Sequence, residues 1–190
     1  MHRTRTFVVV VNGAPRSGKD AFCNSCKQYC DEDESANVMI LSSVDPIKQT
    51  LYQFGWDGEK SDAIRDMIVG IKQMWINAQN GPTIFLFNNI FEFHKEHHGE
   101  DNICFVHIRE PEEIDKLKKA FEGFDSIGIY FTTVLITREQ ADHSNQRDAD
   151  NTDIINSYEY AHKIENNGNH LFDLSELAEG FVDYLLDERR

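Results

Sequence analysis

The chain has 190 residues, of which 40% are hydrophobic, so it is long enough to bury one core and too short for two comfortable domains. Its formal net charge of -14 at pH 7 argues against a nucleic-acid-binding protein, because contact with a phosphate backbone requires a basic surface. No apolar run approaches the ~20 residues that span a bilayer, and the short apolar stretch near the N-terminus lacks a small-residue cleavage site, so we expect a cytoplasmic protein without membrane contact.

The first predicted strand, residues 6–12, leads into a glycine-rich loop that reads G-A-P-R-S-G-K-D over residues 13–20. Gly13 and Gly18 allow the backbone to bend until successive N–H groups point at one phosphate, and a helix expected to end near Tyr29 follows with its positive N-terminus. A strand before the loop and a helix after it favour a nucleotide site over an ordinary turn. The residues expected to bind ATP here are Gly13, Ala14, Pro15, Arg16, Ser17, Gly18, Lys19, Asp20 and Ala21.

Two side chains at the end of this loop carry predicted chemistry. Lys19 is expected to reach the outer phosphates of ATP and to take part in catalysis. Asp20 stands where the usual motif has Ser or Thr, whose hydroxyl binds magnesium. Because a carboxylate can hold Mg²⁺ directly or through water, Asp20 is the predicted metal ligand and Mg²⁺ the predicted second cofactor.

The middle of the chain continues the alternation of strands and helices. Residues 37–42 are the second predicted strand, and a helix begins near Pro46. A longer helix starts at Ser61, a residue type favoured at N-caps, and carries apolar residues at helical spacing. Asn80-Gly81-Pro82 ends that helix and starts another apolar one.

The last part of the chain holds three more predicted strands, at residues 103–108, 127–136 and 160–165. A charged helix is expected from Pro111 to about Phe121, and an amphipathic helix over residues 174–186 closes the chain. Between the last two strands apolar character is lost from Thr137 to Asp153, and a polar segment of this length indicates a lid or disorder. We therefore predict one domain over 1–190, an α/β fold of the P-loop NTPase type with a five-stranded parallel sheet in three α/β/α layers, and a lid at about 138–153.

Five segments together resemble the deoxynucleoside monophosphate kinases of phages. They are GAPRSGKD in the loop, LSSVDPIKQTLYQFGW at 41–56, FVHIREPEEI at 105–114, VLITRE at 134–139 and HKIENNG at 162–168. The chain is also similar to the animal phosphomevalonate kinases, which share the G-K-D ending. The resemblance covers nearly the whole chain and implies a nucleoside-monophosphate-kinase-like fold with a lid. It also implies transfer of the terminal phosphoryl group of ATP to a small phosphate monoester, foremost a nucleoside or deoxynucleoside monophosphate, with phosphomevalonate as an alternative.

The resemblance assigns residues to the ATP side of the site. Kinases of this kind carry lid arginines that close over the transferring group, which implies a catalytic and ATP-binding role for Arg138. Arg147 is expected to bind the substrate, or else to be solvent-exposed lid charge. The turn after the last strand lies beside adenine in these kinases, so Asn167 and Gly168 are expected to contact ATP, although an Asn-Gly turn also fits a simple connection.

The acceptor side is expected to use residues after two other strands. Arg109 follows a buried strand at its carboxyl end, where open parallel sheets bind their ligands, so we predict that it binds the acceptor phosphate and acts in catalysis. Asp45 and Lys48 belong to the S-x-D-P-I-K segment that resembles the stretch before the family's substrate-binding helix. Arg65 is a further substrate-binding candidate that is also explained as a surface residue.

One position departs from the resembling kinases, which have Asp two residues before the counterpart of Arg109. This chain has His107 there, so either Asp20 organises the magnesium or catalytic power is reduced. A nucleotide-binding protein without turnover therefore stays open as a third function.

Two further groups of residues consist of types that can bind a metal ion. Cys23, Cys26 and Cys30 lie on one face of the first helix, but no fourth ligand is evident nearby, so we expect them to pack in the core. Three histidines at the polar end of a helix are expected to be exposed rather than metal-bound: His94, His97 and His98. The sequence does not indicate the oligomeric state of the protein.

Overall fold

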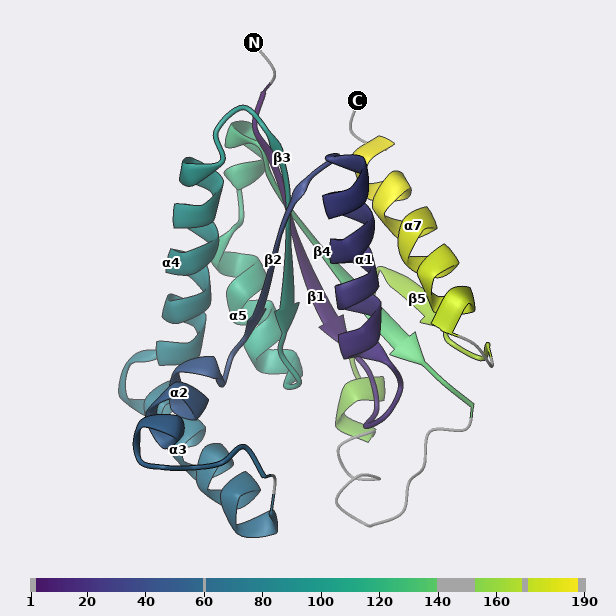
Figure 1. Cartoon of the computed structure of the whole chain (residues 1–190). Helices are drawn as coiled ribbons and strands as arrows, with labels where there is room; N and C mark the ends of the chain where they lie inside the picture. Colours follow the sequence, from purple (N-terminus) through teal and green to yellow (C-terminus); the bar gives the residue numbers. More distant parts are fainter. Residues whose placement is uncertain (1–2, 60, 140–152, 169–170, 188–190) are drawn as a thin grey trace.

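The structure is a computed structural model of the chain, and it describes residues 3–59, 61–139, 153–168 and 171–187. Within these residues, a sheet of five parallel strands in the order β2-β3-β1-β4-β5 lies between two layers of helices (Figure 1). The strands are β1 (Arg5–Asn12), β2 (Asn37–Ser42), β3 (Asp101–His107), β4 (Ile129–Thr137) and β5 (His162–Glu165). The predicted α/β fold with a five-stranded parallel sheet in three layers is confirmed.

Two pairs of helices cover the faces of the sheet. The helices α1 (Lys19–Asp33) and α7 (Leu171–Asp187) pack on one face, and α4 (Gly81–Glu96) and α5 (Pro111–Ala120) on the other (Figure 1). Two further helices, α2 (Asp45–Gln53) and α3 (Asp62–Gln79), lie near the carboxyl ends of the strands. No described helix is both long enough and apolar enough to cross a bilayer.

The central strand β1 is buried along its whole length because it pairs with β3 on one side and β4 on the other. Alternate side chains enter opposite cores: Val9 and Val11 face α1 and α7, whereas Val8 and Val10 face α4 and α5. This two-sided burial explains the continuous valine run, since a parallel strand covered on both faces has no solvent-facing positions. The strand therefore holds the start of the following loop in a fixed place.

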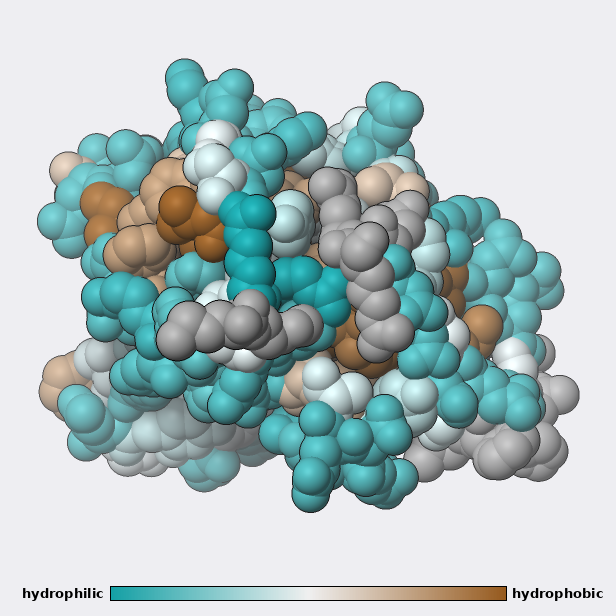
Figure 2. All heavy atoms as spheres, turned by 90° about the horizontal axis from the view of Figure 1, so that it is seen from above, coloured by the Kyte–Doolittle hydropathy of each residue, from teal (hydrophilic) through white to brown (hydrophobic). Residues whose placement is uncertain are grey.

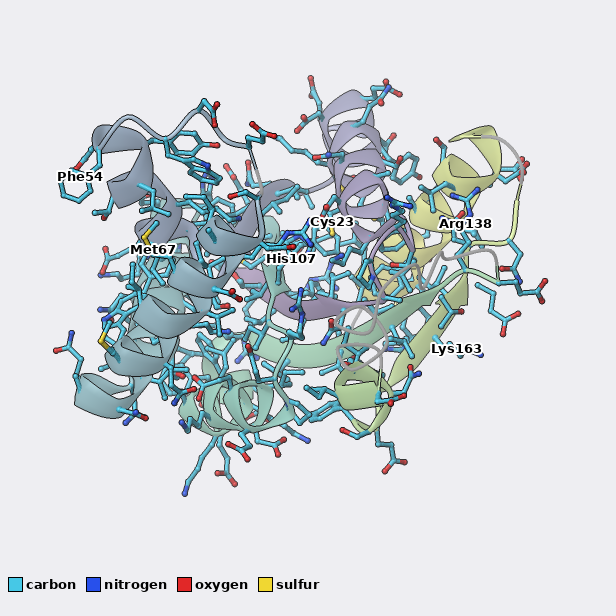
Figure 3. All side chains as sticks on the ribbon, turned by 90° about the horizontal axis from the view of Figure 1, so that it is seen from below. Cys23, Phe54, Met67, His107, Arg138 and Lys163 are labelled. Carbon is cyan, nitrogen blue, oxygen red and sulfur yellow. The ribbon has the colours of Figure 1, made fainter. Side chains whose placement is uncertain are left out.

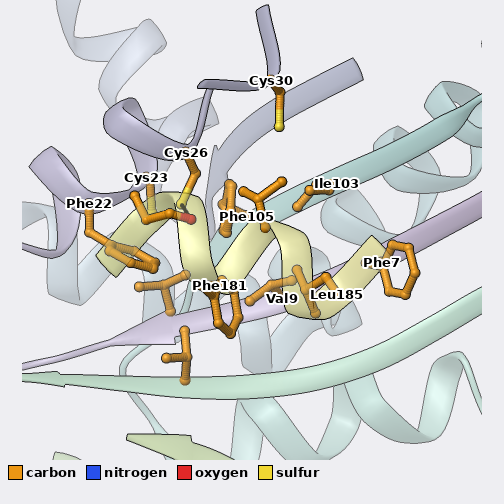
Figure 4. Packing of buried hydrophobic residues seen from close by; sticks show 14 of the residues in the cluster. Phe7, Val9, Phe22, Cys23, Cys26, Cys30, Ile103, Phe105, Phe181 and Leu185 are labelled. Atoms are coloured by element: carbon orange, nitrogen blue, oxygen red, sulfur yellow. Dashed lines mark hydrogen bonds between the residues drawn. The ribbon is translucent and has the colours of Figure 1, made fainter. Parts of the chain in front are cut away.

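The cysteines of α1 belong to the core. Cys23, Cys26 and Cys30 are fully buried between α1, α7 and the sheet, beside Phe105 and Phe181 (Figure 4). Burial raises the pKa values of the Cys23 and Cys26 thiols, so thiolates are disfavoured. The prediction that these cysteines pack in the core is confirmed by their burial.

The prediction that His94 is exposed is wrong. Its side chain is buried, its Nδ1 lies 2.8 Å from the hydroxyl of Thr6, and burial lowers its pKa. The physical reason is the spacing of α4, because His94 continues the buried stripe of Leu86 and Ile90 at intervals of four residues. His98 is exposed as predicted, and His97 is half-buried with its ring against Phe93.

The ends of several elements also differ from the prediction, and three of them are instructive. The first helix continues four residues past Tyr29, to Asp33. Strand β4 starts at Ile129 instead of 127, because a short 3-10 helix, η1 (Phe124–Ile127), precedes it and ends at Gly128 with a φ of 96°. Strand β5 starts two residues later than predicted, after Ala161, whose backbone N–H donates to Thr133 Oγ1.

Candidate active site

The predicted phosphate-binding loop, residues 13–20, connects β1 to α1 in a conformation that requires glycine at two positions. Gly18 has a φ of 93°, in the left-handed region that other residues adopt only with strain. A Cβ on Gly13 would lie 2.5 Å from the carbonyl oxygen of Ile136, and a Cβ on Gly18 would lie 2.4 Å from Asn166 Nδ2. The loop is therefore enclosed by β4 and by the turn after β5, and its backbone is held close to both.

Lys19 and Asp20 are the first two residues of α1. Lys19 is half-buried, whereas the Asp20 side chain is 79% exposed at the helix N-terminus. Asp20 Oδ1 lies 3.7 Å from Nε2 of His107, which ends β3. Figure 3 looks onto this edge of the sheet and shows His107 near its middle. The carboxylate predicted to hold magnesium and the histidine that replaces the usual Asp are thus neighbours.

The imidazole of His107 is largely buried, with its side chain 17% exposed. Burial lowers its pKa, and the negative charges of Asp20 and Asp45 oppose that effect. Its Nδ1 is buried and has no hydrogen-bond partner among the described residues. Of the two carboxylates near His107, Asp20 is the more exposed and therefore the more accessible to a cation.

Asp45 and Lys48 form a local cluster at the start of α2. Asp45 Oδ2 accepts a hydrogen bond of 2.6 Å from the backbone N–H of Ser42, and its Oδ1 lies 3.3 Å from Lys48 Nζ. Ser43, which follows Ser42, donates its backbone N–H to the carbonyl oxygen of His107. This turn is therefore tied to the end of β3, which brings Asp45 and Lys48 to the same edge as the phosphate-binding loop.

Arg109 follows β3 by two residues and its side chain is exposed. Its carbonyl oxygen accepts a hydrogen bond from Asn12 Nδ2 at 3.1 Å. The next residue, Glu110, binds Lys72 of α3 with a separation of 2.5 Å between carboxylate oxygen and ammonium. Burial raises the pKa of Glu110, but the Lys72 ammonium outweighs it and holds the pKa below its usual value. The start of α5 is thus fixed both to β1 and to α3.

Arg65 lies on α3 and is exposed. It precedes Lys72 by seven residues, a spacing of two helical turns, so both residues point to similar sides of α3. Since Lys72 reaches Glu110, Arg65 lies on the side of α3 that faces the end of β3. The structure therefore places Arg65 on the same side of the molecule as Arg109 without a described contact between them.

The predicted ATP-side residues come together at the ends of β4 and β5. Arg138 directly follows β4 and is exposed, and Figure 3 shows it at the β5 side of this edge. The adjacent Glu139 donates its backbone N–H to Asn167 Oδ1 at 2.9 Å. The preceding residue of the turn, Asn166, donates from Nδ2 to the carbonyl oxygen of Ser17 at 2.9 Å. Arg138 and Asn167 are thus neighbours, and Gly168 follows in the same turn.

Arg147 and most of the predicted lid, residues 140–152, lie outside the described residues. Figure 2 shows the opposite face of the molecule, seen from above, which is largely hydrophilic with smaller hydrophobic areas, the most extensive at the left of the view. None of the described candidate site residues belongs to the amino-terminal ends of the strands. The candidate site is confined to the carboxyl edge.

The structure of the Mycobacterium tuberculosis APS kinase in complex with AMPPNP and APS is 16% identical, with a TM-score of 0.54 over 97% of this chain and 99% of that one. A mutant of the same kinase gives 14% identity and a TM-score of 0.52 over the same shares. The chain has the P-loop kinase fold. No protein-family model and no curated protein matches the sequence. At these identities the similarity shows the fold alone, and the resemblance to phage deoxynucleoside monophosphate kinases stays a prediction.

Among the buried polar residues of this P-loop kinase fold, three make side-chain contacts that were not predicted from the sequence: Asn12, Lys72 and Asn166. Each contacts a segment that is distant in sequence, by 97, 38 and 149 residues respectively. The signal for Asn12 was its place at the end of a valine strand, since a polar side chain there has to be satisfied by hydrogen bonds. For Lys72 the signal was a lysine directly after Ile71, inside the apolar pattern of α3.

Proposed function

We propose that the protein is a single-domain, ATP-dependent phosphotransferase that acts on a small phosphate monoester, foremost a nucleoside or deoxynucleoside monophosphate. The observation that carries the proposal is the enclosed phosphate-binding loop. Its backbone lies close to strand β4 at Gly13 and to the turn after β5 at Gly18. Such a loop ahead of a helix N-terminus binds phosphate through backbone N–H groups. Arg109 and Lys48 at the same edge supply cations for a second phosphate.

The residues of the loop fit the phosphates of ATP. Residues 13–18 offer the backbone, Lys19 adds a positive charge from the first turn of α1, and Ala21 follows on the same helix. Asn167, Gly168 and Arg138 lie together at the end of β4 and β5, where they border the loop through Asn166. We infer that ATP lies along the loop with its base toward the turn after β5.

Asp20 fits Mg²⁺, because the ion takes one or two carboxylates together with phosphate oxygens instead of a complete protein cage. Its exposure at the helix N-terminus leaves both oxygens accessible. The ion, when bound, neutralises negative charge that develops on the transferring group. In this proposal the neighbouring His107 does not bind the metal. Its ring lies beside Asp20, and burial disfavours the charged form of that ring.

The acceptor phosphate is assigned to Arg109, with Arg65 and Lys48 as further contacts and Asp45 as the residue that holds Lys48. Arginine suits this task because its planar group binds two phosphate oxygens at once. Arg138 is assigned to the transferring group and Arg147 to the substrate. The reaction then depends on positioning and charge, which is what phosphoryl transfer demands of a protein.

The APS kinase structure contains AMPPNP and APS, so a protein of this fold accommodates a nucleotide analogue together with a second small ligand. This supports a two-substrate site and adds APS to the acceptors to be tested. The second candidate is a protein that binds a nucleotide without turning it over. It is favoured by His107, which lies next to Asp20 at the position where the resembling kinases have a second carboxylate.

The test is ADP release from ATP in a coupled assay across deoxynucleoside and nucleoside monophosphates, phosphomevalonate and APS. We expect acceptor-dependent ADP release with one or more monophosphates, lost in Lys19→Ala. Release with phosphomevalonate or APS alone would reassign the acceptor. Nucleotide binding without ADP release for any acceptor would support the second candidate, and no nucleotide binding would refute both.

A further inference from the structure

Asn12 is a buried polar residue at the end of the valine strand β1. It is 3% exposed, and it follows four valines that are also buried. An amide side chain in such a place is costly unless its donor and its acceptor both find partners. The contacts of Asn12 therefore indicate what the residue does.

The two ends of the Asn12 amide bind two different loops. Its Oδ1 accepts a hydrogen bond of 3.0 Å from the backbone N–H of Gly13, the first residue of the phosphate-binding loop. Its Nδ2 donates a hydrogen bond of 3.1 Å to the carbonyl oxygen of Arg109. Asparagine is suited to this task because one short, planar side chain carries both a donor and an acceptor.

The bridge lies where the backbone pairing between the two strands has ended. The register of β1 and β3 runs from Arg5 with Asp101 to Val10 with Val106, and stops there. On its other side β1 stays paired with β4 as far as Asn12 with Leu135. Beyond Val10, the side chain of Asn12 therefore connects the two diverging segments that lead to the phosphate-binding loop and to Arg109.

We propose that Asn12 is a positioning residue that sets the separation between the phosphate-binding loop and Arg109. The inference rests on the proposed function, in which the loop binds the donor and Arg109 the acceptor. In-line transfer requires both phosphates to be held at one separation, so a fixed link between their two binding segments serves the chemistry directly. Asn12 acts through the backbone of Gly13 and Arg109 and does not touch the reacting atoms.

A second buried asparagine provides a matched control. Asn166 is 5% exposed, and its Nδ2 donates to the carbonyl oxygen of Ser17 in the same phosphate-binding loop. Its backbone N–H donates to the carbonyl oxygen of Thr137, so its described contacts lead toward β4 and not toward Arg109. Loss of the Asn166 amide thus disturbs the loop without releasing the acceptor segment.

The first test compares Asn12→Asp with Asn166→Asp by steady-state kinetics on the acceptor found in the panel. Each substitution keeps the shape of the side chain, removes one hydrogen-bond donor and adds the same charge beside the loop. We expect Asn12→Asp to raise the acceptor KM about tenfold relative to the KM for ATP, which is the size of effect expected from the loss of one hydrogen bond. We expect Asn166→Asp to raise the KM for ATP more than the acceptor KM. If the ratio of the acceptor KM to the KM for ATP changes in the same way in Asn12→Asp and Asn166→Asp, the proposal is overturned.

The second test needs no turnover and uses hydrogen exchange with Mg·AMPPNP. In the wild-type protein we expect the analogue to slow exchange in residues 13–23 and, through Asn12, in residues 108–114. In Asn12→Asp only the first segment should respond, whereas Asn166→Asp keeps the response at 108–114. Equal protection of 108–114 in wild type and Asn12→Asp contradicts the proposal.

The two tests separate the inference from the proposed function. Protection of 108–114 that depends on Asn12, without phosphoryl transfer to any acceptor, supports the link and refutes the kinase. A wild-type protein that does not respond to Mg·AMPPNP refutes both. If Asn12→Asp does not fold, Asn12→Ala and Asn166→Ala repeat the exchange comparison without an added charge, and equal protection of 108–114 in these two variants overturns the link.

Discussion

The ion pair between Lys72 and Glu110 predicts an asymmetric response to the loss of either partner. Lys72 is the one buried residue of α3, and its side chain is 7% exposed, whereas that of Glu110 is 43% exposed. Breaking a fully buried pair costs about 3–5 kcal/mol, most of it because the remaining charge is left without a partner. Removing Glu110 leaves a buried ammonium, while removing Lys72 leaves a carboxylate that water reaches.

We therefore expect Glu110→Ala to lower the free energy of unfolding by about 3 kcal/mol and Lys72→Met, which keeps the packing of the aliphatic stem, by about 1 kcal/mol. At about 3 °C per kcal/mol for a chain of this size, the fall in Tm is about 9 °C and 3 °C respectively. Urea unfolding followed by circular dichroism measures both values. The exposed pair of Lys95 and Glu92 is the control, because Glu92→Ala should cost less than about 1 kcal/mol.

The pH dependence of this pair has a definite sign. The pKa of Glu110 is lowered in the folded protein, so its contribution is fully present above the unfolded carboxyl value and is lost as the pH falls through the folded value. The difference in stability between wild type and Glu110→Ala should accordingly shrink below about pH 4. Equal destabilisation by Glu110→Ala and Lys72→Met at neutral pH, or a difference that grows in acid, would refute this reasoning.

The remaining predictions concern the candidate site. Lys19→Ala should abolish nucleotide binding or turnover without changing urea unfolding, since the proposed role of its charge is to bind phosphates and not to pack in the core; calorimetry with Mg·AMPPNP and unfolding curves check this, and unaltered binding contradicts it. Gly18→Ala should weaken AMPPNP binding and cost about 1–3 kcal/mol, because its Cβ would clash with Asn166 at a φ of 93°. Gly99→Ala, at a φ of 90° with nothing within 4 Å, is the control for backbone strain alone and should bind AMPPNP normally. Arg109→Lys keeps the charge but loses the planar fork, so the acceptor KM should rise far more than the KM for ATP; equal effects on both would assign Arg109 to the transferring group.

The tight conformation of the glycine-rich loop at residues 13–20 could be predicted from the sequence because its determinants are local. Gly13 and Gly18 are needed for backbone geometry within eight consecutive residues, and a valine strand directly precedes them. The layers of the fold followed for the same reason, since strand and helix periodicities extend over short windows. The place of Arg109 at the carboxyl end of a buried strand was likewise readable from its neighbours.

The supports of the site could not be predicted because their partners are far apart in the sequence. Asn12 and Asn166 acquire their roles only when strand order brings β3 and the turn after β5 to opposite sides of the loop. The burial of His94 follows from its four-residue spacing from Ile90 on α4, a signal that the polarity of histidine obscures in the sequence. The ends of β4 and β5 depended on hydrogen bonds to other segments, such as that between Ala161 and Thr133.

The enclosure of the phosphate-binding loop has a consequence for the thermodynamics of nucleotide binding. Its first residue is held by Asn12, its Ser17 carbonyl by Asn166, and its Gly13 lies against the backbone of Ile136. Most of the conformational entropy of the loop is therefore lost during folding and not when a nucleotide arrives. A loop organised in advance makes the entropic cost of binding small. The heat of binding should then vary little between ATP and shorter phosphates that occupy the same loop, with differences in affinity arising from the contacts outside it.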